Sequence, residues 1–132
     1  MIVVDASVLA PALADDDEDG DCARARLRGQ FLAAPELIDL EVSSVLRRLL
    51  RSGYLSARRA EQALSDLLVL PLRRAPHRPL ISRCWSLRDN LTSYDASYVA
   101  LAEALGATLL TADIRLSRAA GLRCEVEVLA RP

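Results

Sequence analysis

Residues 93–113 read SYDASYVALAEALGATLLTAD, and this stretch predicts a helix followed by a buried strand with an acid just beyond it. Ser93 can cap a helix over residues 93–105, and Gly106 stands just past its end, where glycine commonly terminates helices. The apolar run that follows predicts a strand at residues 107–111, ahead of Asp113. A helix that leads into a buried strand is the unit from which α/β folds are built.

The same alternation of strands and helices extends through the rest of the chain. Further strands are expected at residues 2–5, 30–34, 69–72 and 124–129. Further helices are expected from Ser7, as the cap, to about Ala14, and at residues 22–28, 36–52, 56–68, 80–87 and 114–120. The acidic stretch 15–21 is expected to be a loop. Short apolar strands between helices predict a parallel sheet that is covered on both faces.

Length and composition indicate a single globular domain over residues 1–132, because 52% of the residues are apolar. No apolar run approaches the ~20 residues that span a membrane. The N-terminus lacks the basic start and cleavage site of a signal peptide, so a cytoplasmic protein with no membrane contact is expected. The cysteines, Cys22, Cys84 and Cys124, are too far apart to form a metal-ligand pair, and buried, reduced thiols are expected.

The basic residues exclude several classes of protein. All 17 are arginine, whereas a phosphate-binding loop, a receiver domain and a haloacid-dehalogenase-type phosphatase all need a lysine. The sole histidine, His77, lies between prolines and no G-x-S-x-G motif occurs, so a serine hydrolase is excluded and His77 is predicted to be an exposed helix-start residue. The stretch from Asp15 resembles the start of an EF-hand, but its twelfth position is Arg26, where a glutamate is required.

Four acidic residues lie at positions that the stability of the fold alone does not explain: Asp5, Glu41, Asp95 and Asp113. Asp5 and Asp113 follow strands, and parallel sheets place ligand sites at the carboxyl ends of strands. If the four carboxylates converge, their mutual repulsion and desolvation require compensation. A hard divalent cation such as Mg²⁺ or Mn²⁺ supplies it. The pattern therefore favours metal-dependent cleavage of phosphodiester bonds.

Each acid also has a structural explanation. Asp5 can accept backbone hydrogen bonds where a strand turns into a helix. Glu41 interrupts the apolar stripe of its helix and can sit at the edge of that stripe with its head in water. Asp95 complements a helix dipole in the first turn, and Asp113 can cap the next helix. Their joint occurrence at strand ends and at inward-facing helix positions favours one shared site.

The chain resembles the PIN-domain ribonucleases, specifically the VapC toxins of bacterial toxin–antitoxin pairs. The resemblance covers nearly the whole chain and rests on IVVDAS at residues 2–7, PELIDLEV at 35–42, and LTSYDASY at 91–98 followed by ATLLTAD at 107–113. It implies an α/β fold of three layers, α/β/α, around a central parallel sheet. It also implies an endoribonuclease that needs Mg²⁺ or Mn²⁺, a homodimer, and a VapB-like antitoxin that blocks the site.

Carried over by position, the resemblance makes Asp5, Glu41, Asp95 and Asp113 the catalytic and metal-binding residues, with the hydroxyls of Ser7 and Thr111 in support. The implied substrate is RNA, including structured RNA such as tRNA or rRNA. A PIN-fold module that binds RNA or a partner without catalysis remains the alternative, and a DNA-directed nuclease of the same fold ranks lower.

Substrate contact has to come from local positive charge, because the net charge is −1. Two arginine groups are available for it, and each can equally be a solvated helix face: Arg47, Arg48 and Arg51, and Arg73, Arg74 and Arg78. The leucine-rich helices at residues 36–52 and 56–68 can form a partner-binding groove or a dimer face, or simply pack in the core.

Overall fold

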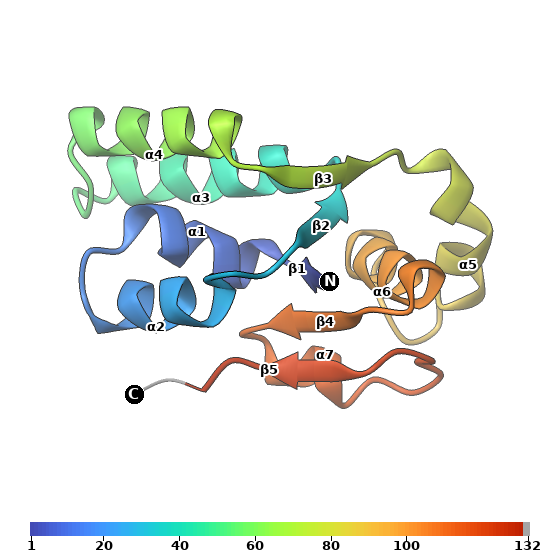
Figure 1. Ribbon diagram of the computed structural model, residues 1–132. Coiled ribbons are helices and arrows are strands. Elements are labelled where there is room, and N and C mark those ends of the chain that lie inside the picture. Colours follow the sequence, from blue (N-terminus) through green and yellow to red (C-terminus); the bar gives the residue numbers. More distant parts are fainter. Residues whose placement is uncertain (131–132) are drawn as a thin grey trace.

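A central parallel sheet organises the computed structural model, which describes residues 1–130 (Figure 1). The sheet has five strands in the order β3-β2-β1-β4-β5. Their bounds are β1 Ile2–Val4, β2 Leu32–Pro35, β3 Leu72–Ala75, β4 Thr108–Thr111 and β5 Val126–Val128. The central strands β1 and β2 are buried along their whole length, whereas the edge strands β3 and β5 are half exposed. This burial explains why the inner strands are continuous apolar runs in the sequence.

Helices cover both faces of the sheet, which confirms the predicted three-layer α/β/α architecture. One group contains α1 Ala6–Ala14, α2 Glu18–Leu27, α3 Ile38–Arg51 and α4 Ala57–Val69, on the left in Figure 1. The other contains α5 Ile81–Ser86, preceded by the 3₁₀ turn Arg78–Leu80, and α6 Ser93–Leu105, on the right. The short helix α7 Ile114–Ser117 contacts β5.

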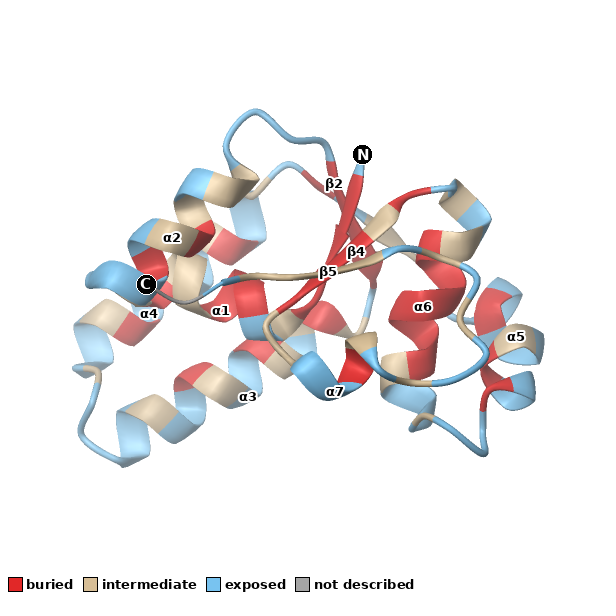
Figure 2. Cartoon of the chain, turned by 90° about the horizontal axis from the view of Figure 1, so that it is seen from below, coloured by how far each residue is buried: buried red, intermediate tan, exposed pale blue. Residues whose placement is uncertain are grey.

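Helix α6 supplies much of the core. Residues 96–102 are all buried, and the helix packs against β1, β2 and β4 (Figure 2). The largest of these side chains is Tyr98, which is 2% exposed. Because the middle of α6 is held on the sheet, its first turn has a fixed position at the edge where the strands end.

The strand order reverses between β1 and β4, because β2 and β3 lie on one side of β1 and β4 and β5 lie on the other. From β1 the chain passes into α1 on one side of the sheet, and it reaches β4 from α6 on the other. The two strands are neighbours, with Val4 opposite Leu110. In open α/β sheets this reversal leaves a crevice at the carboxyl ends of the two strands, and ligands bind there.

Two helix caps differ from the prediction. Helix α1 is capped by Asp5, whose side chain accepts a hydrogen bond from the backbone N–H of Ser7, so Ser7 lies in the first turn and is not the cap. Helix α6 is capped by Thr92, which accepts from the N–H of Asp95, so Ser93 is already helical. Neighbouring residues with short polar side chains are equally good caps, and only the path of the chain selects one.

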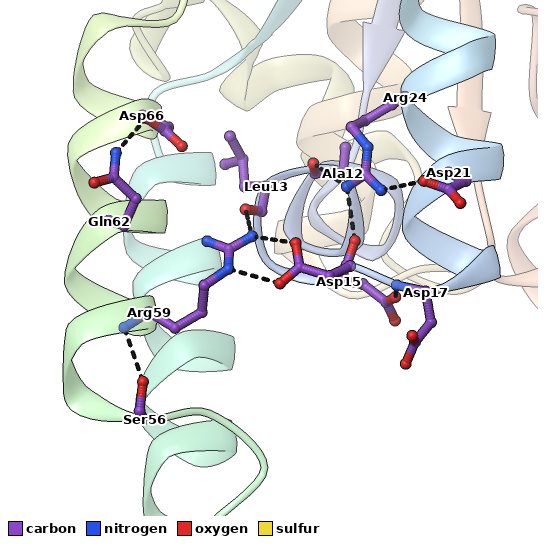
Figure 3. A network of polar contacts seen from close by, with 11 residues as sticks. Ala12, Leu13, Asp15, Asp17, Asp21, Arg24, Ser56, Arg59, Gln62 and Asp66 are labelled. Carbon is purple, nitrogen blue, oxygen red and sulfur yellow. Dashed lines mark hydrogen bonds and ion pairs between the residues drawn. The ribbon is translucent and has the colours of Figure 1, made fainter.

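The acidic stretch 15–21 is not entirely a loop, because α2 begins at Glu18. Acidic residues in a first helical turn complement the helix dipole, so this composition suits a helix start as well as a loop. Figure 3 shows how two arginines anchor the segment. Arg24 donates to the carbonyl oxygens of Ala12 (3.0 Å) and Asp15 (2.7 Å), and Arg59 of α4 donates to the Asp16 carboxylate (3.0 Å).

Several predicted ends are also wrong. The strand expected at residues 69–72 is β3 at Leu72–Ala75, because α4 continues to Val69. The helix expected at 114–120 ends at Ser117. In α3, the buried side is formed by Ile38, Val42 and Leu46. Glu41 therefore lies at the margin of that buried side, and Leu40 is exposed. Packing onto neighbouring elements, and not apolar periodicity alone, decides where these elements end.

Two further expectations concern the burial of the cysteines and the absence of a membrane-spanning segment. All three cysteines are free, but only Cys84 is buried, whereas Cys22 and Cys124 are half buried. Within residues 1–130, none of the helices combines the length and the apolar character that crossing a bilayer requires.

The contact between α1 and α2 depends on Gly20, which is buried in α2. A Cβ atom at Gly20 would stand 1.8 Å from the carbonyl oxygen of Asp15. Backbone atoms cannot move aside as a flexible side chain can, so we expect Gly20→Ala to lower the free energy of unfolding by about 3 kcal/mol. Urea unfolding measures the loss. Asp19→Ala, at the exposed neighbouring position, should cost less than about 1 kcal/mol, and equal costs for both variants would contradict the close contact.

Candidate functional site

Asp5 directly follows β1 and carries a carboxylate that accepts hydrogen bonds on both oxygens. Oδ1 accepts hydrogen bonds from the backbone N–H of Ser7 (3.1 Å) and from the Ser7 hydroxyl (2.5 Å). Oδ2 accepts from the Thr111 hydroxyl (2.5 Å) at the end of β4. Asp5 is only 9% exposed. Burial raises the pKa of Asp5, the hydrogen bonds from Ser7 and Thr111 oppose this rise, and the charge of Asp95 adds to it.

The two hydroxyls that hold Asp5 also hold the backbone that follows β4. The Ser7 hydroxyl accepts a hydrogen bond from the N–H of Ala112 (2.8 Å), and the Thr111 hydroxyl accepts from the N–H of Asp113 (3.0 Å). Thr111 is completely buried. The positions named for support by the sequence therefore contact Asp5 directly and join the carboxyl ends of β1 and β4.

Glu41 reaches the same region from α3. Its Oε1 accepts a hydrogen bond from the phenol of Tyr98 at 2.5 Å. Burial raises the pKa of Glu41, the bond from Tyr98 opposes this rise, and the charges of Asp5 and Asp95 add to it. Burial and the neighbouring Glu41 also raise the pKa of Tyr98, so the phenol acts as a hydrogen-bond donor.

Asp95 and Asp113 complete the group of acids. Asp95 lies in the first turn of α6, where burial and then the charge of Asp113 raise the pKa of Asp95, while Arg115 opposes the rise. Asp113 caps α7 and accepts from the N–H of Arg115 (2.9 Å), and the two side chains form an ion pair (3.2 Å). The bond from Arg115 lowers the pKa of Asp113.

These electrostatic effects link the four acids through Asp95. Its charge raises the pKa of Asp5 and of Glu41, and the charge of Asp113 raises that of Asp95. Through Asp95, these effects couple carboxylates that come from the end of β1, from α3, from α6 and from the end of β4. Asp5, Asp95 and Asp113 also occupy the cap and first-turn positions that their structural explanations predict.

The donor atoms suit a hard divalent cation, because carboxylate oxygens are what Mg²⁺ and Mn²⁺ prefer. Three of the four carboxylates have raised pKa values, because burial and neighbouring acids disfavour their charged forms. A bound cation would stabilise those charged forms. In the part of the chain that the structure describes, no three acidic, histidine or cysteine side chains enclose an ion by themselves. Mg²⁺ keeps several waters and commonly uses one or two carboxylates, so it does not require three side chains that enclose it.

Two residues of this region were not named as site residues from the sequence. In the sequence, the only signal for Tyr98 is its position three residues after Asp95, on the same side of the helix. Arg115 places a guanidinium beside the acids and is 89% exposed on its side chain; the only signal for it is its place two residues after Asp113. Of the two predicted arginine groups, Arg74 is engaged within the fold, since it donates to Asp39 (2.7 Å) and to the carbonyl of Leu67 (2.8 Å).

A hollow of about 220 Å³ lies between α5, the start of α6 and the residue just before α3, and none of the four acids is among its lining residues. It is lined mainly by apolar side chains, and Ile81 and Trp85 on α5 are 56% and 67% exposed. His77, exposed as predicted, closes one side by accepting a hydrogen bond from the N–H of Leu37 at 3.0 Å. An exposed apolar surface of this kind is suited to contact with a partner.

Comparison with known proteins gives consistent matches over the chain. Residues 2–122 match the family described as PIN domain. Ribonuclease VapC9 of Mycobacterium tuberculosis is 44% identical over 131 residues, which are 99% of this chain and 100% of the relative. Two solved structures share the fold over 100% of both chains. Mycobacterium tuberculosis VapC20, a sarcin-ricin loop cleaving toxin, has a TM-score of 0.72 at 20% identity, and a toxin–antitoxin complex from Klebsiella pneumoniae has 0.69 at 19%.

The raised pKa of Asp95 has a consequence for stability. The folded state holds this proton more tightly than the unfolded state, so ionisation of Asp95 costs stability. The cost is absent below the ordinary pKa of 3.8, grows as the pH rises through the raised pKa, and is constant above it. We therefore expect Asp95→Asn to raise the Tm of the metal-free protein at pH 7 by about 3 °C.

Differential scanning calorimetry in chelator, over a range of pH, measures this gain. It should shrink as the pH falls toward 4, and the matched variant Asp89→Asn, at an exposed position before α6, should leave the Tm unchanged. Added divalent metal should raise the Tm of the unsubstituted chain more than that of Asp95→Asn. A gain that stays the same at every pH would contradict the electrostatic cause.

Proposed function

We propose that this chain, which belongs to the PIN-domain family and within it to the VapC ribonucleases, is the metal-dependent endoribonuclease toxin of a toxin–antitoxin pair. The observation that carries the proposal is the group of four carboxylates supplied by the end of β1, by α3, by α6 and by the end of β4, three of them with raised pKa values. It occurs in a chain that is 44% identical to a protein named as a ribonuclease. The proposed reaction is hydrolysis of phosphodiester bonds in RNA.

In this proposal Asp5, Glu41 and Asp95 hold Mg²⁺ or Mn²⁺, and Asp113 assists at a second metal or a bound water. When bound, the metal lowers the pKa of a water and polarises the scissile phosphate. The protein holds the acids in place beforehand: hydroxyls fix Asp5, a phenol fixes Glu41, and the first turn of α6 carries Asp95. No histidine is needed for this chemistry.

Arg115 is the residue that we propose for contact with the RNA backbone. An acidic site repels phosphate unless a cation lies nearby, and guanidinium binds phosphate in a bidentate manner. Arg115 pairs with Asp113 while remaining 89% exposed, so its guanidinium is accessible to RNA. The substrate class is RNA with unpaired, splayed bases, as in the loops of structured RNA such as tRNA or rRNA.

We further propose a homodimer formed through the side of the molecule that carries α5. Ile81 and Trp85 are large, exposed and adjacent to the apolar hollow of about 220 Å³. Apolar and aromatic surface of this kind is concentrated in the buried centre of homodimer interfaces. Sedimentation equilibrium at micromolar concentration should give the mass of two chains, and Trp85→Ala should shift it toward one.

A second hollow is the surface that we propose for a VapB-like antitoxin. It has a volume of about 350 Å³ and lies between α1 and α3, with Val45, Leu49 and Leu55 among its lining residues and the acidic residues 15–17 at its rim. An amphipathic helix with apolar anchors and a basic flank fits such a groove. A cytoplasmic location follows for a toxin that acts on cellular RNA.

The test of function is cleavage of total cellular RNA by the purified, antitoxin-free chain. We expect discrete fragments with Mg²⁺ or Mn²⁺ and none with chelator, because the carboxylates need the cation to act. Asp5→Ala and Asp95→Asn should each reduce the rate by about 100-fold or more. Asp89→Asn, an exposed aspartate outside the group, should cleave like the unsubstituted chain.

Two other outcomes would argue against the proposal. RNA or antitoxin affinity with no metal-dependent product would support the non-catalytic PIN-fold module instead. Cleavage that persists in chelator and in both site variants would mean that the activity does not come from these acids.

A further inference from the structure

We propose that Tyr98 is a positioning residue that holds Glu41 in the orientation required to bind the metal ion. The inference rests on the proposed function of the carboxylate group. Its basis is a single contact between two helices: the phenol of Tyr98 on α6 donates to Oε1 of Glu41 on α3 at 2.5 Å, across 57 residues of sequence.

The Glu41 carboxylate depends on this one hydrogen bond for its orientation, whereas the Asp5 carboxylate is held by several hydrogen bonds. Asp5 accepts from three donors, provided by Ser7 and Thr111. Among residues 1–130, the Glu41 side chain has one hydrogen-bond donor, Tyr98. Glu41 also stands at the margin of the buried side of α3, where a long, flexible side chain can otherwise turn toward water.

Tyr98 is suited to this task because its ring is packed in the core. The residue is 2% exposed and is among the largest buried side chains of the core. It lies one turn after Asp95 on the same helix, so α6 carries one acid and positions another. A tyrosine present only for packing satisfies its hydroxyl with any nearby acceptor. Here the acceptor is a carboxylate of the proposed site, and the bond to Oε1 leaves Oε2 available for an ion.

Tyr98→Phe tests the inference, because it removes the hydroxyl and keeps the ring in the core. The readout is Mn²⁺ binding to the purified chain without RNA, followed by the electron paramagnetic resonance signal of free Mn²⁺. We expect binding about 10-fold weaker than in the unsubstituted chain, the size found when partners of metal ligands are removed. Tyr54→Phe removes the same atom from a side chain that is 84% exposed and should leave binding unchanged.

A second pair of variants separates positioning from general packing. If Tyr98 acts only through Glu41, then Tyr98→Phe should cause no further loss of Mn²⁺ binding in a Glu41→Ala background. A further loss there would assign Tyr98 a merely structural role and overturn the inference. The Tm of each variant in chelator, compared with that of its parent chain, reports on folding independently of metal.

The outcomes also distinguish this inference from the proposed function. Equal Mn²⁺ affinity in Tyr98→Phe and the unsubstituted chain would overturn the role of Tyr98 and leave the metal site standing. Absence of Mn²⁺ binding in the unsubstituted chain would overturn both. Weaker binding in Tyr98→Phe, together with no added loss in the Glu41→Ala background, supports both.

Discussion

The structure depends on the parallel pairing of β1 with β4 and on the buried carboxylate that spans their ends. Val4 lies opposite Leu110, and one residue further Asp5 donates its N–H to the carbonyl of Leu110 and accepts from the Thr111 hydroxyl. A buried carboxylate is costly unless hydrogen bonds compensate it. The hydroxyls of Ser7 and Thr111 supply that compensation. They thereby fix the edge of the sheet at which the other acids meet.

The fold bears an electrostatic cost for this arrangement. Asp5, Glu41 and Asp95 all have raised pKa values, so in the absence of a cation their charges oppose folding at neutral pH. The buried middle of α6, residues 96–102, offsets that cost by packing against β1, β2 and β4. The same helix carries Asp95 and the phenol that binds Glu41. Helix α6 therefore contributes both to the stability of the fold and to the proposed metal site.

Most of the fold could be predicted from short-range patterns, and the errors have a common cause. The inner strands could be predicted because they are short, continuous apolar runs, and α6 because a capping residue precedes it and Gly106 follows it. The caps at Asp5 and Thr92 were missed because Ser7 and Ser93 are equally good caps locally. The start of α2 at Glu18 was missed because acidic residues suit both a loop and a first helical turn. In each case neighbouring elements decide between local structures of similar energy.

The sequence by itself determined the parallel α/β architecture and the membership of the PIN-domain family, because apolar runs and motif residues are properties of short stretches. Only the tertiary structure decided which donor serves each acid. Thr111 bonds Asp5 across 106 residues, and Tyr98 bonds Glu41 across 57. Contacts between distant residues depend on how helices and strands pack, and no local pattern encodes that geometry.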